Sequence, residues 1–119
     1  MDWDVGFHDA FAVEFADFSP NVKIEIAAMV QLLGRFGPQL GRPHADTLQG
    51  SRHANMKELR FKADDGVWRV AYAFDPRRAA LLLVAGDKSG SSEKRFYRAL
   101  IEKADRRFDE HLRDLEGDG

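Results

Sequence analysis

The 119-residue sequence contains no cysteine, which excludes disulfide bonds, thiolate metal sites and cysteine nucleophiles. It also lacks an apolar run of the roughly 20 residues that span a bilayer. The amino terminus, MDWDVGFHDA, is acidic and has no basic region followed by an apolar stretch, so it does not predict a secretory signal. These absences predict a soluble, cytoplasmic protein with no membrane partner.

Motifs for cofactors are missing as well. No glycine-rich loop with the spacing of a P-loop or of a dinucleotide-binding fold follows a predicted strand. The four histidines share no ligand spacing on one element, which argues against zinc. We therefore expect no cofactor and no metal site.

The net charge of -2 hides an uneven distribution. Residues 1–41 carry two basic and six acidic side chains, residues 42–107 carry 15 and nine, and residues 108–119 carry one and five. A basic middle between acidic ends favours local attraction of a polyanion. Chance segregation of solvated charges explains the same counts, so composition alone leaves both interpretations open.

The first third of the chain is predicted to be mainly helical. A short strand is expected within residues 2–7, followed by a short helix that ends at about Ala16. Ser19 and Pro20 form a strong start for a second helix, because serine caps the first turn and proline has no N–H to leave unpaired there. Gly37-Pro38 ends this helix, whose apolar stripe consists of Val22, Ile26, Met29, Leu33 and Phe36.

The rest of the chain predicts a sheet and a final helix. After an ordered loop over residues 37–55, strands are expected at 57–62, 67–74 and 79–85, and the last is apolar enough to be buried on both faces. Residues 86–90 lead into a long helix with one apolar stripe. We therefore predict one domain over residues 1–119 in the α+β class. Its two layers are an antiparallel meander sheet and, packed on it, the amino-terminal strand and two helices, with the long carboxy-terminal helix following.

Strand alternation separates the charged residues of this sheet from the bulky apolar ones. Arg69 falls on the face opposite Trp68, Val70, Tyr72 and Phe74, which are expected to face the helices. Glu58, Arg60 and Lys62 share the face of Arg69. Because the neighbours of Arg69 are small, we expect open space in which its guanidinium can bind a phosphate. An ordinary solvent face with weak ion pairs remains the alternative.

Such a face suits RNA cleavage without a metal. That reaction needs a base for the ribose 2′-hydroxyl, cations for the charge that develops on phosphorus, and an acid for the leaving 5′-oxygen. His44 and His53, both in the 37–55 loop, are candidates for acid–base chemistry, because histidine is the residue type most often used for it near neutral pH. A solvated loop histidine is the more ordinary interpretation of each.

Several short motifs, taken in order, resemble one family over about residues 2–108. They are Leu40-Gly41-x-Pro43, Leu48-x-Gly50, Glu58-Leu59-Arg60-Phe61, Gly66-x-x-Arg69-Val70-x-Tyr72, and an apolar strand that runs into Gly86-Asp87-Lys88. In this order and spacing the chain resembles the RelE/HigB-type toxins of bacterial type II toxin–antitoxin modules, most closely the phage-derived Gp49-like branch.

The resemblance implies a ribosome-dependent endoribonuclease that cuts translated mRNA in the A site and is held inactive by a cognate antitoxin. It implies a helix-turn-helix antitoxin, with DNA contacted only through that partner. As stabilisers of the transition state it implies Arg60, Arg69 and Lys88, with Tyr97 as an approximate counterpart of the family's tyrosine that orients or protonates. The candidates for the base, Glu58 and His53, are taken from this sequence and not from the family pattern. Lys57, Lys62, Lys94 and Arg95 are the expected RNA-binding cations.

Two departures from the family pattern stand out. Glu58 occupies a position where RelE-type members usually have lysine, so it is either the base or a partner of an arginine. The helix from Arg98 onward is longer than in compact relatives, and it either covers part of the concave face or provides an antitoxin surface.

A catalytically degenerate module that only binds a partner or RNA is the alternative to an RNA-cleaving toxin. A metal-dependent nuclease is a third interpretation, disfavoured by the scarcity of clustered carboxylates on the sheet.

Overall fold

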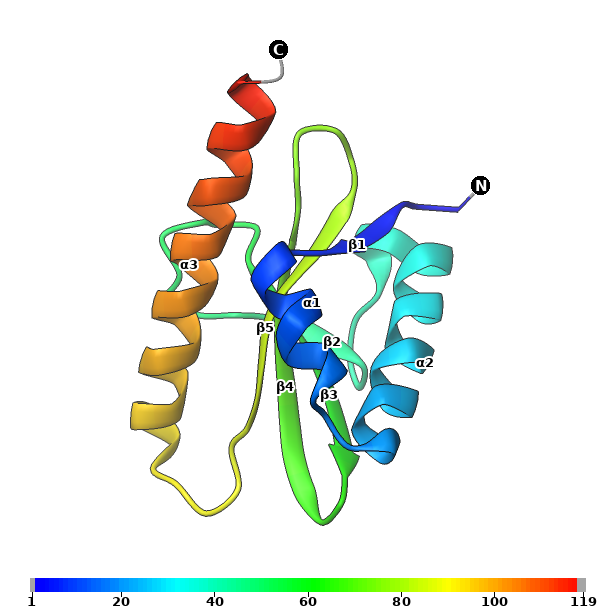
Figure 1. Ribbon diagram of the computed structural model, residues 1–119, viewed down its shortest axis with the longest axis vertical. Coiled ribbons are helices and arrows are strands. Elements are labelled where there is room, and N and C mark those ends of the chain that lie inside the picture. Colours follow the sequence, from blue (N-terminus) through cyan, green and yellow to red (C-terminus); the bar gives the residue numbers. More distant parts are fainter. Residues whose placement is uncertain (1, 118–119) are drawn as a thin grey trace.

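A five-stranded sheet with strand order β1-β5-β4-β3-β2 forms the centre of the computed structural model, which describes residues 2–117 (Figure 1). The elements are β1 (Val5–Phe7), α1 (Asp9–Ala16), α2 (Pro20–Phe36), a 3-10 turn (Gly37–Gln39), β2 (Ala45–Thr47), β3 (Lys57–Ala63), β4 (Gly66–Phe74), β5 (Ala80–Asp87) and α3 (Glu93–Gly117). The predicted α+β architecture is confirmed. The single domain stays a prediction, and its ends, residues 1, 118 and 119, lie outside the described residues. No helix within 2–117 is long and apolar enough to cross a membrane.

The sheet is an antiparallel meander from β2 to β5, and β1 joins it in parallel beside β5. Strand β2 lies inside the stretch predicted as loop. It is three residues long, with Ala45 opposite Leu59 and Asp46 opposite Glu58. A strand this short shows no alternation from which it could be recognised, so the prediction missed it.

Helix α2 begins and ends where its signals predict. The Ser19 hydroxyl accepts a hydrogen bond from the Val22 N–H at 3.3 Å, and Pro20 is the first helical residue. Gly37 ends the helix at φ +57°, and a Cβ there would come within 2.4 Å of the Trp3 indole nitrogen. Phe36, predicted in the buried stripe, is 47% exposed because the helix ends there, and the Arg35 guanidinium lies 5.6 Å from its ring centre.

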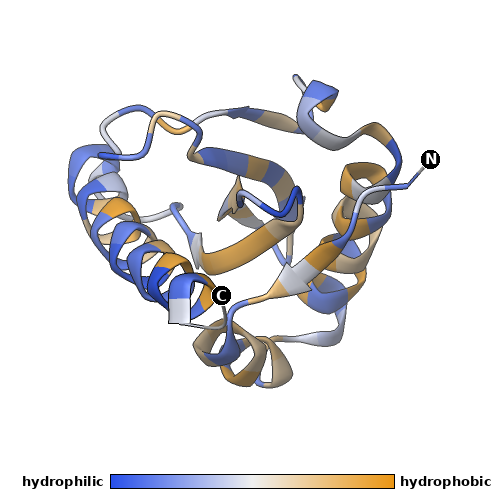
Figure 2. Cartoon of the chain, turned by 90° about the horizontal axis from the view of Figure 1, so that it is seen from above, coloured by the Kyte–Doolittle hydropathy of each residue, from blue (hydrophilic) through white to orange (hydrophobic). Residues whose placement is uncertain are grey.

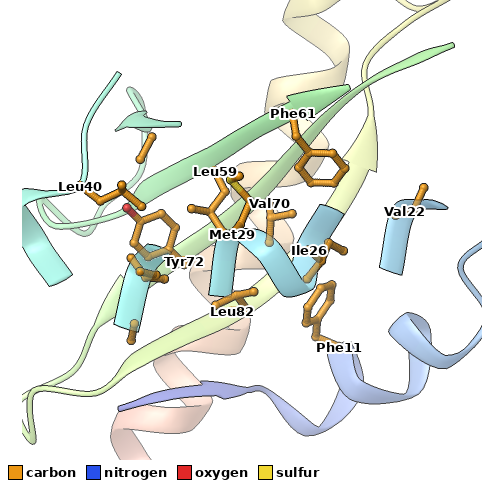
Figure 3. Packing of buried hydrophobic residues seen from close by; sticks show 13 residues of the cluster. Phe11, Val22, Ile26, Met29, Leu40, Leu59, Phe61, Val70, Tyr72 and Leu82 are labelled. Atoms are coloured by element: carbon orange, nitrogen blue, oxygen red, sulfur yellow. The ribbon is translucent and has the colours of Figure 1, made fainter. Parts of the chain in front are cut away.

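Both faces of the sheet are covered (Figure 2). On the first face the bulky residues of β3, β4 and β5 pack against α1 and α2, as Figure 3 shows for Leu59, Val70 and Leu82. On the second face the small and aliphatic residues of β4 and β5 pack against the apolar stripe of α3. Strand β5 is buried on both sides, as predicted. The carboxy-terminal helix thus covers part of the face that carries Arg69.

Polar contacts secure the second half of α3. The Asp105 carboxylate accepts hydrogen bonds from the Ser51 hydroxyl at 2.5 Å and from the Arg52 N–H at 3.2 Å. Arg107 donates to both carboxylate oxygens of Glu14, at 2.8 and 2.6 Å, and to the Leu83 carbonyl at 2.7 Å. These contacts join α3 to the β2–β3 loop, to α1 and to β5, and so fix its position on the sheet.

One buried hydroxyl makes no such contact. The side chain of Tyr72 is fully buried, and its oxygen has no hydrogen-bond partner among the described residues. An unsatisfied buried hydroxyl costs roughly 1–3 kcal/mol.

We therefore predict that Tyr72→Phe raises the free energy of unfolding by about 1 kcal/mol in urea denaturation. The other tyrosine, Tyr97, is the matched control, because its hydroxyl has two partners and Tyr97→Phe should not stabilise. Destabilisation by Tyr72→Phe would contradict the prediction.

Candidate functional site

Four polar side chains from β3, β4 and the first half of α3 meet on the second face of the sheet. Arg60 and Arg69 lie directly opposite each other in the two strands, and Glu58 lies opposite Ala71. The apolar residues between them, Leu59 and Val70, point to the other face. Alternation along β3 and β4 therefore places Glu58, Arg60 and Arg69 on one face, as predicted, and α3 adds Tyr97.

Arg69 is the buried member of this group, with 5% of its surface exposed. Its Nε donates to the Tyr97 hydroxyl at 3.1 Å, its Nη1 donates to the Trp68 carbonyl at 2.9 Å, and its Nε lies 3.9 Å from Glu58 Oε1. The prediction of open space above Arg69 is therefore wrong. Its small neighbours do leave room, but Tyr97 and Glu58 fill it.

Glu58 connects the two arginines with the tyrosine. Its Oε1 accepts the Tyr97 O–H at 2.9 Å, its Oε2 accepts from Arg60 Nη1 at 3.4 Å, and only 4% of the residue is exposed. Burial raises the pKa of Glu58, an effect that outweighs the opposing influence of Tyr97 and the two arginines. Burial also raises the pKa of the Tyr97 hydroxyl. A carboxylate with a raised pKa is suited to accept a proton near neutral pH.

A cavity of about 460 Å³ lies in front of this group. Glu58, Arg60 and Tyr97 line it, and Lys94 from the first turn of α3 contributes a further cation. Gln49 lines it from the β2–β3 loop. Arg69 is not part of the lining, because Glu58 and Tyr97 lie between its guanidinium and the cavity. The volume falls within the range of small-ligand sites.

The other predicted cations are distributed around this cavity. Lys88 lies 6.0 Å from the Tyr97 ring centre and forms an ion pair with Glu93 at 2.9 Å. Lys62 is exposed on the strand face that carries Arg60. Arg95 lines a separate cavity beside Ala85 and Gly86 of β5. Lys57 points to the opposite face of the sheet, where its Nζ donates to the Pro38 carbonyl at 3.2 Å.

Neither predicted histidine joins the cluster. His53 Nε2 lies 2.8 Å from Asp109 Oδ1, and its ring packs edge-on against Phe108. Asp109 follows Tyr97 by 12 residues of α3, which is about 18 Å along a helix. His44 lies before β2, and its carbonyl accepts the Arg60 N–H at 2.8 Å. Within residues 2–117, no three histidine, aspartate or glutamate side chains are placed to hold a metal ion.

Sequence reasoning missed the contribution of β2 and the residues beside it. Arg42 and Asp46 line the cavity and form an ion pair at 2.7 Å, and Asp46 also lies 3.6 Å from Arg60 Nη1. The hydrogen bond with Arg42 lowers the pKa of Asp46. The four-residue spacing of these opposite charges was visible in the sequence, but their place at the site depends on the pairing of β2 with β3.

Comparison with known proteins identifies the family. The model of the family described as "Phage derived protein Gp49-like (DUF891)" matches residues 13–109. The chain belongs to the Gp49-like family. It is 43% identical over 105 residues to HigB3 of Mycobacterium tuberculosis, a protein that is named as a candidate toxin. The match covers 88% of this chain and 90% of the relative. It is 44% identical over 92 residues to HigB2 of the same organism, also a candidate toxin by name, covering 76% of this chain but only 45% of that longer relative.

A solved structure shares the fold. It is an arginine-to-alanine double mutant of the Escherichia coli toxin RelE in the free state, with a TM-score of 0.58 and 12% identity, covering 87% of this chain and 97% of RelE. Similarity at this identity speaks for the fold alone. Together with the sequence relatives, it confirms the resemblance to the RelE/HigB type and to its Gp49-like branch.

The raised pKa of Glu58 predicts a pH-dependent stability for this Gp49-like protein. Because the folded state holds the Glu58 proton more tightly than the unfolded chain, the contribution of Glu58 is fully present below its unfolded pKa and is lost as the pH rises through the folded value. Glu58→Gln removes this loss. We predict that the free energy of unfolding of the variant, relative to wild type, increases between about pH 4 and pH 7 in urea denaturation.

The exposed glutamate Glu102 on α3 provides the control for this series. The free energy of unfolding of Glu102→Gln should equal that of wild type at every pH. This control shows whether replacing any glutamate by glutamine changes the stability. A difference between Glu58→Gln and wild type that stays constant with pH, or shrinks as the pH rises, would contradict the assignment.

Proposed function

We propose that this protein is the toxin of a type II toxin–antitoxin module and that it cleaves mRNA on the ribosome without a metal. The observation that carries the proposal is a buried carboxylate with a raised pKa, hydrogen-bonded to a tyrosine, beside a cavity lined by Arg60 and Lys94. The family membership supports the same class of activity.

The side chains can be assigned roles in one reaction. Glu58 takes the proton of the ribose 2′-hydroxyl, and the 2′-oxygen forms a bond to the adjacent phosphorus. Arg60 and Lys94 stabilise the negative charge that develops on the phosphoryl oxygens. The bond from phosphorus to the 5′-oxygen breaks, and the Tyr97 hydroxyl protonates the leaving oxygen. The products are a 2′,3′-cyclic phosphate and a 5′-hydroxyl.

The hydrogen bond between Tyr97 and Glu58, at 2.9 Å, offers a route for resetting the site. After cleavage Glu58 holds the proton that Tyr97 lacks, so transfer along this bond restores both groups. Arg69 donates a hydrogen bond from its Nε to the Tyr97 hydroxyl and so acts as a positioning residue. Lys88, 6.0 Å from the Tyr97 ring centre, adds positive potential next to the leaving group.

A cognate antitoxin is part of the proposal. We propose a helix-turn-helix partner that neutralises the toxin and provides any contact with DNA. Co-expression of the adjoining open reading frame should restore growth to cells that produce this protein.

A second candidate function is binding without catalysis. The observation that favours it is the burial of Arg69, whose guanidinium faces Glu58 and Tyr97 instead of the cavity. A degenerate module would retain this arrangement for stability and would bind only an antitoxin-like partner or RNA. The two functions differ in one outcome, which is cleavage of a transcript.

Substitution of the arginines tests the proposal. We predict that induced wild-type protein arrests growth and cuts a reporter transcript, mapped by primer extension, and that Arg60→Ala and Arg69→Ala each reduce cleavage by at least about 100-fold. Arg60→Ala is the more reliable variant because Arg60 is partly exposed, whereas removal of Arg69 leaves Glu58 buried without its partner.

Arg35→Ala on α2 is the matched control, since Arg35 is exposed and lies on the helix that packs against the opposite face of the sheet. It should cleave like wild type. Undiminished cleavage by folded Arg60→Ala would refute the site assignment, and absence of cleavage by wild type on translating ribosomes would favour the binding module.

A further inference from the structure

The cavity extends beyond the residues used for chemistry. Besides Glu58, Arg60 and Tyr97, its lining includes Leu48 and Gln49 of the β2–β3 loop. Leu48 is buried in the core beneath α3, whereas Gln49 is exposed. The loop therefore presents one amide side chain next to the cluster.

This loop is held firmly in place. The Leu48 N–H donates to the Met56 carbonyl at 3.0 Å, which closes the loop at its base. Two residues beyond Gln49, the Ser51 hydroxyl donates to the buried carboxylate of Asp105 at 2.5 Å. Because both flanks of Gln49 are anchored, the backbone of the loop needs little ordering when a ligand binds.

The lining of the cavity combines charged groups with one neutral amide. Arg60 and Lys94 provide cations near Tyr97, as a phosphate requires. Asp46 is compensated by Arg42 at 2.7 Å and lies 3.6 Å from Arg60, whereas Gln49 is an uncharged member of the same lining. An amide carries a donor and an acceptor side by side, which matches the edge of a nucleobase. Aromatic rings such as Tyr97 also stack on unpaired RNA bases.

We propose that Gln49 forms a nucleobase subsite for the nucleotide next to the scissile phosphate and sets the base preference of cleavage. The inference rests on the proposed RNA-cleaving function. Adenine is the expected base, because glutamine pairs in a bidentate manner with its adjacent donor and acceptor. Such a pair discriminates against other bases by about 5- to 160-fold.

The cleavage experiment uses a set of reporter transcripts that differ only in the nucleotides flanking one cut site. Wild type should prefer adenine at one flanking position, and Gln49→Ala should reduce that preference to less than about twofold. Gln39→Ala, an exposed glutamine in the 3-10 turn outside the cavity, is the matched control and should keep the wild-type preference.

A binding experiment separates failure of this inference from failure of the proposed function. Short oligonucleotides of one base, made resistant by 2′-O-methylation, are titrated against wild type and both glutamine variants by fluorescence anisotropy. Base-dependent affinity that disappears in Gln49→Ala supports the subsite even if no cleavage is found. If wild type prefers a base other than adenine and Gln49→Ala loses that preference, the result also supports the subsite and corrects the identity of the base that it binds.

Two results would overturn the inference. The first is wild-type cleavage with a flanking-base preference that Gln49→Ala leaves intact. The second is equal affinity of wild type and Gln49→Ala for every oligonucleotide in a protein that does not cleave RNA.

Discussion

The structure depends on how one buried charge is compensated. Arg69 lies in the middle strand of the sheet beneath α3, where an unpaired guanidinium would be strongly unfavourable. Glu58 on the neighbouring strand provides the opposite charge, and the Tyr97 hydroxyl from α3 completes the hydrogen bonding. The same three groups therefore attach the helix to the sheet and create a carboxylate with a raised pKa. Stability and chemistry are linked through this contact.

The two halves of helix α3 differ in charge. Residues 93–107 carry six basic and three acidic side chains, and residues 108–117 carry one and four. The basic half borders the cavity through Lys94 and Tyr97, and the acidic half begins about three helical turns beyond Tyr97. A polyanion is attracted to the first half and repelled from the second. Asp105 and Arg107 near the middle hold the helix in place, which keeps Tyr97 in register with Glu58.

Local patterns were sufficient for part of this site. Alternation along β3 and β4 placed Glu58, Arg60 and Arg69 on one face, because side chains of a strand point to alternate sides whatever surrounds the sheet. The path of α3 across that face was not local information, so the burial of Arg69 could not be predicted. The position of His53 away from Tyr97 was not local information either, since its neighbour is Asp109, 12 residues beyond Tyr97 on α3. The family resemblance pointed to Tyr97, and the structure shows that it bonds to Glu58, the residue that the family pattern left unexplained.

The central claim is that Glu58 and Tyr97 act as one unit in RNA cleavage. A double-mutant cycle on the cleavage rate, with Glu58→Gln, Tyr97→Phe and the combined variant, tests it most directly. Because the two side chains share one hydrogen bond, we expect the double variant to be about as slow as the slower single variant. Rate losses that multiply in the double variant would show that the two groups act independently and would contradict the account.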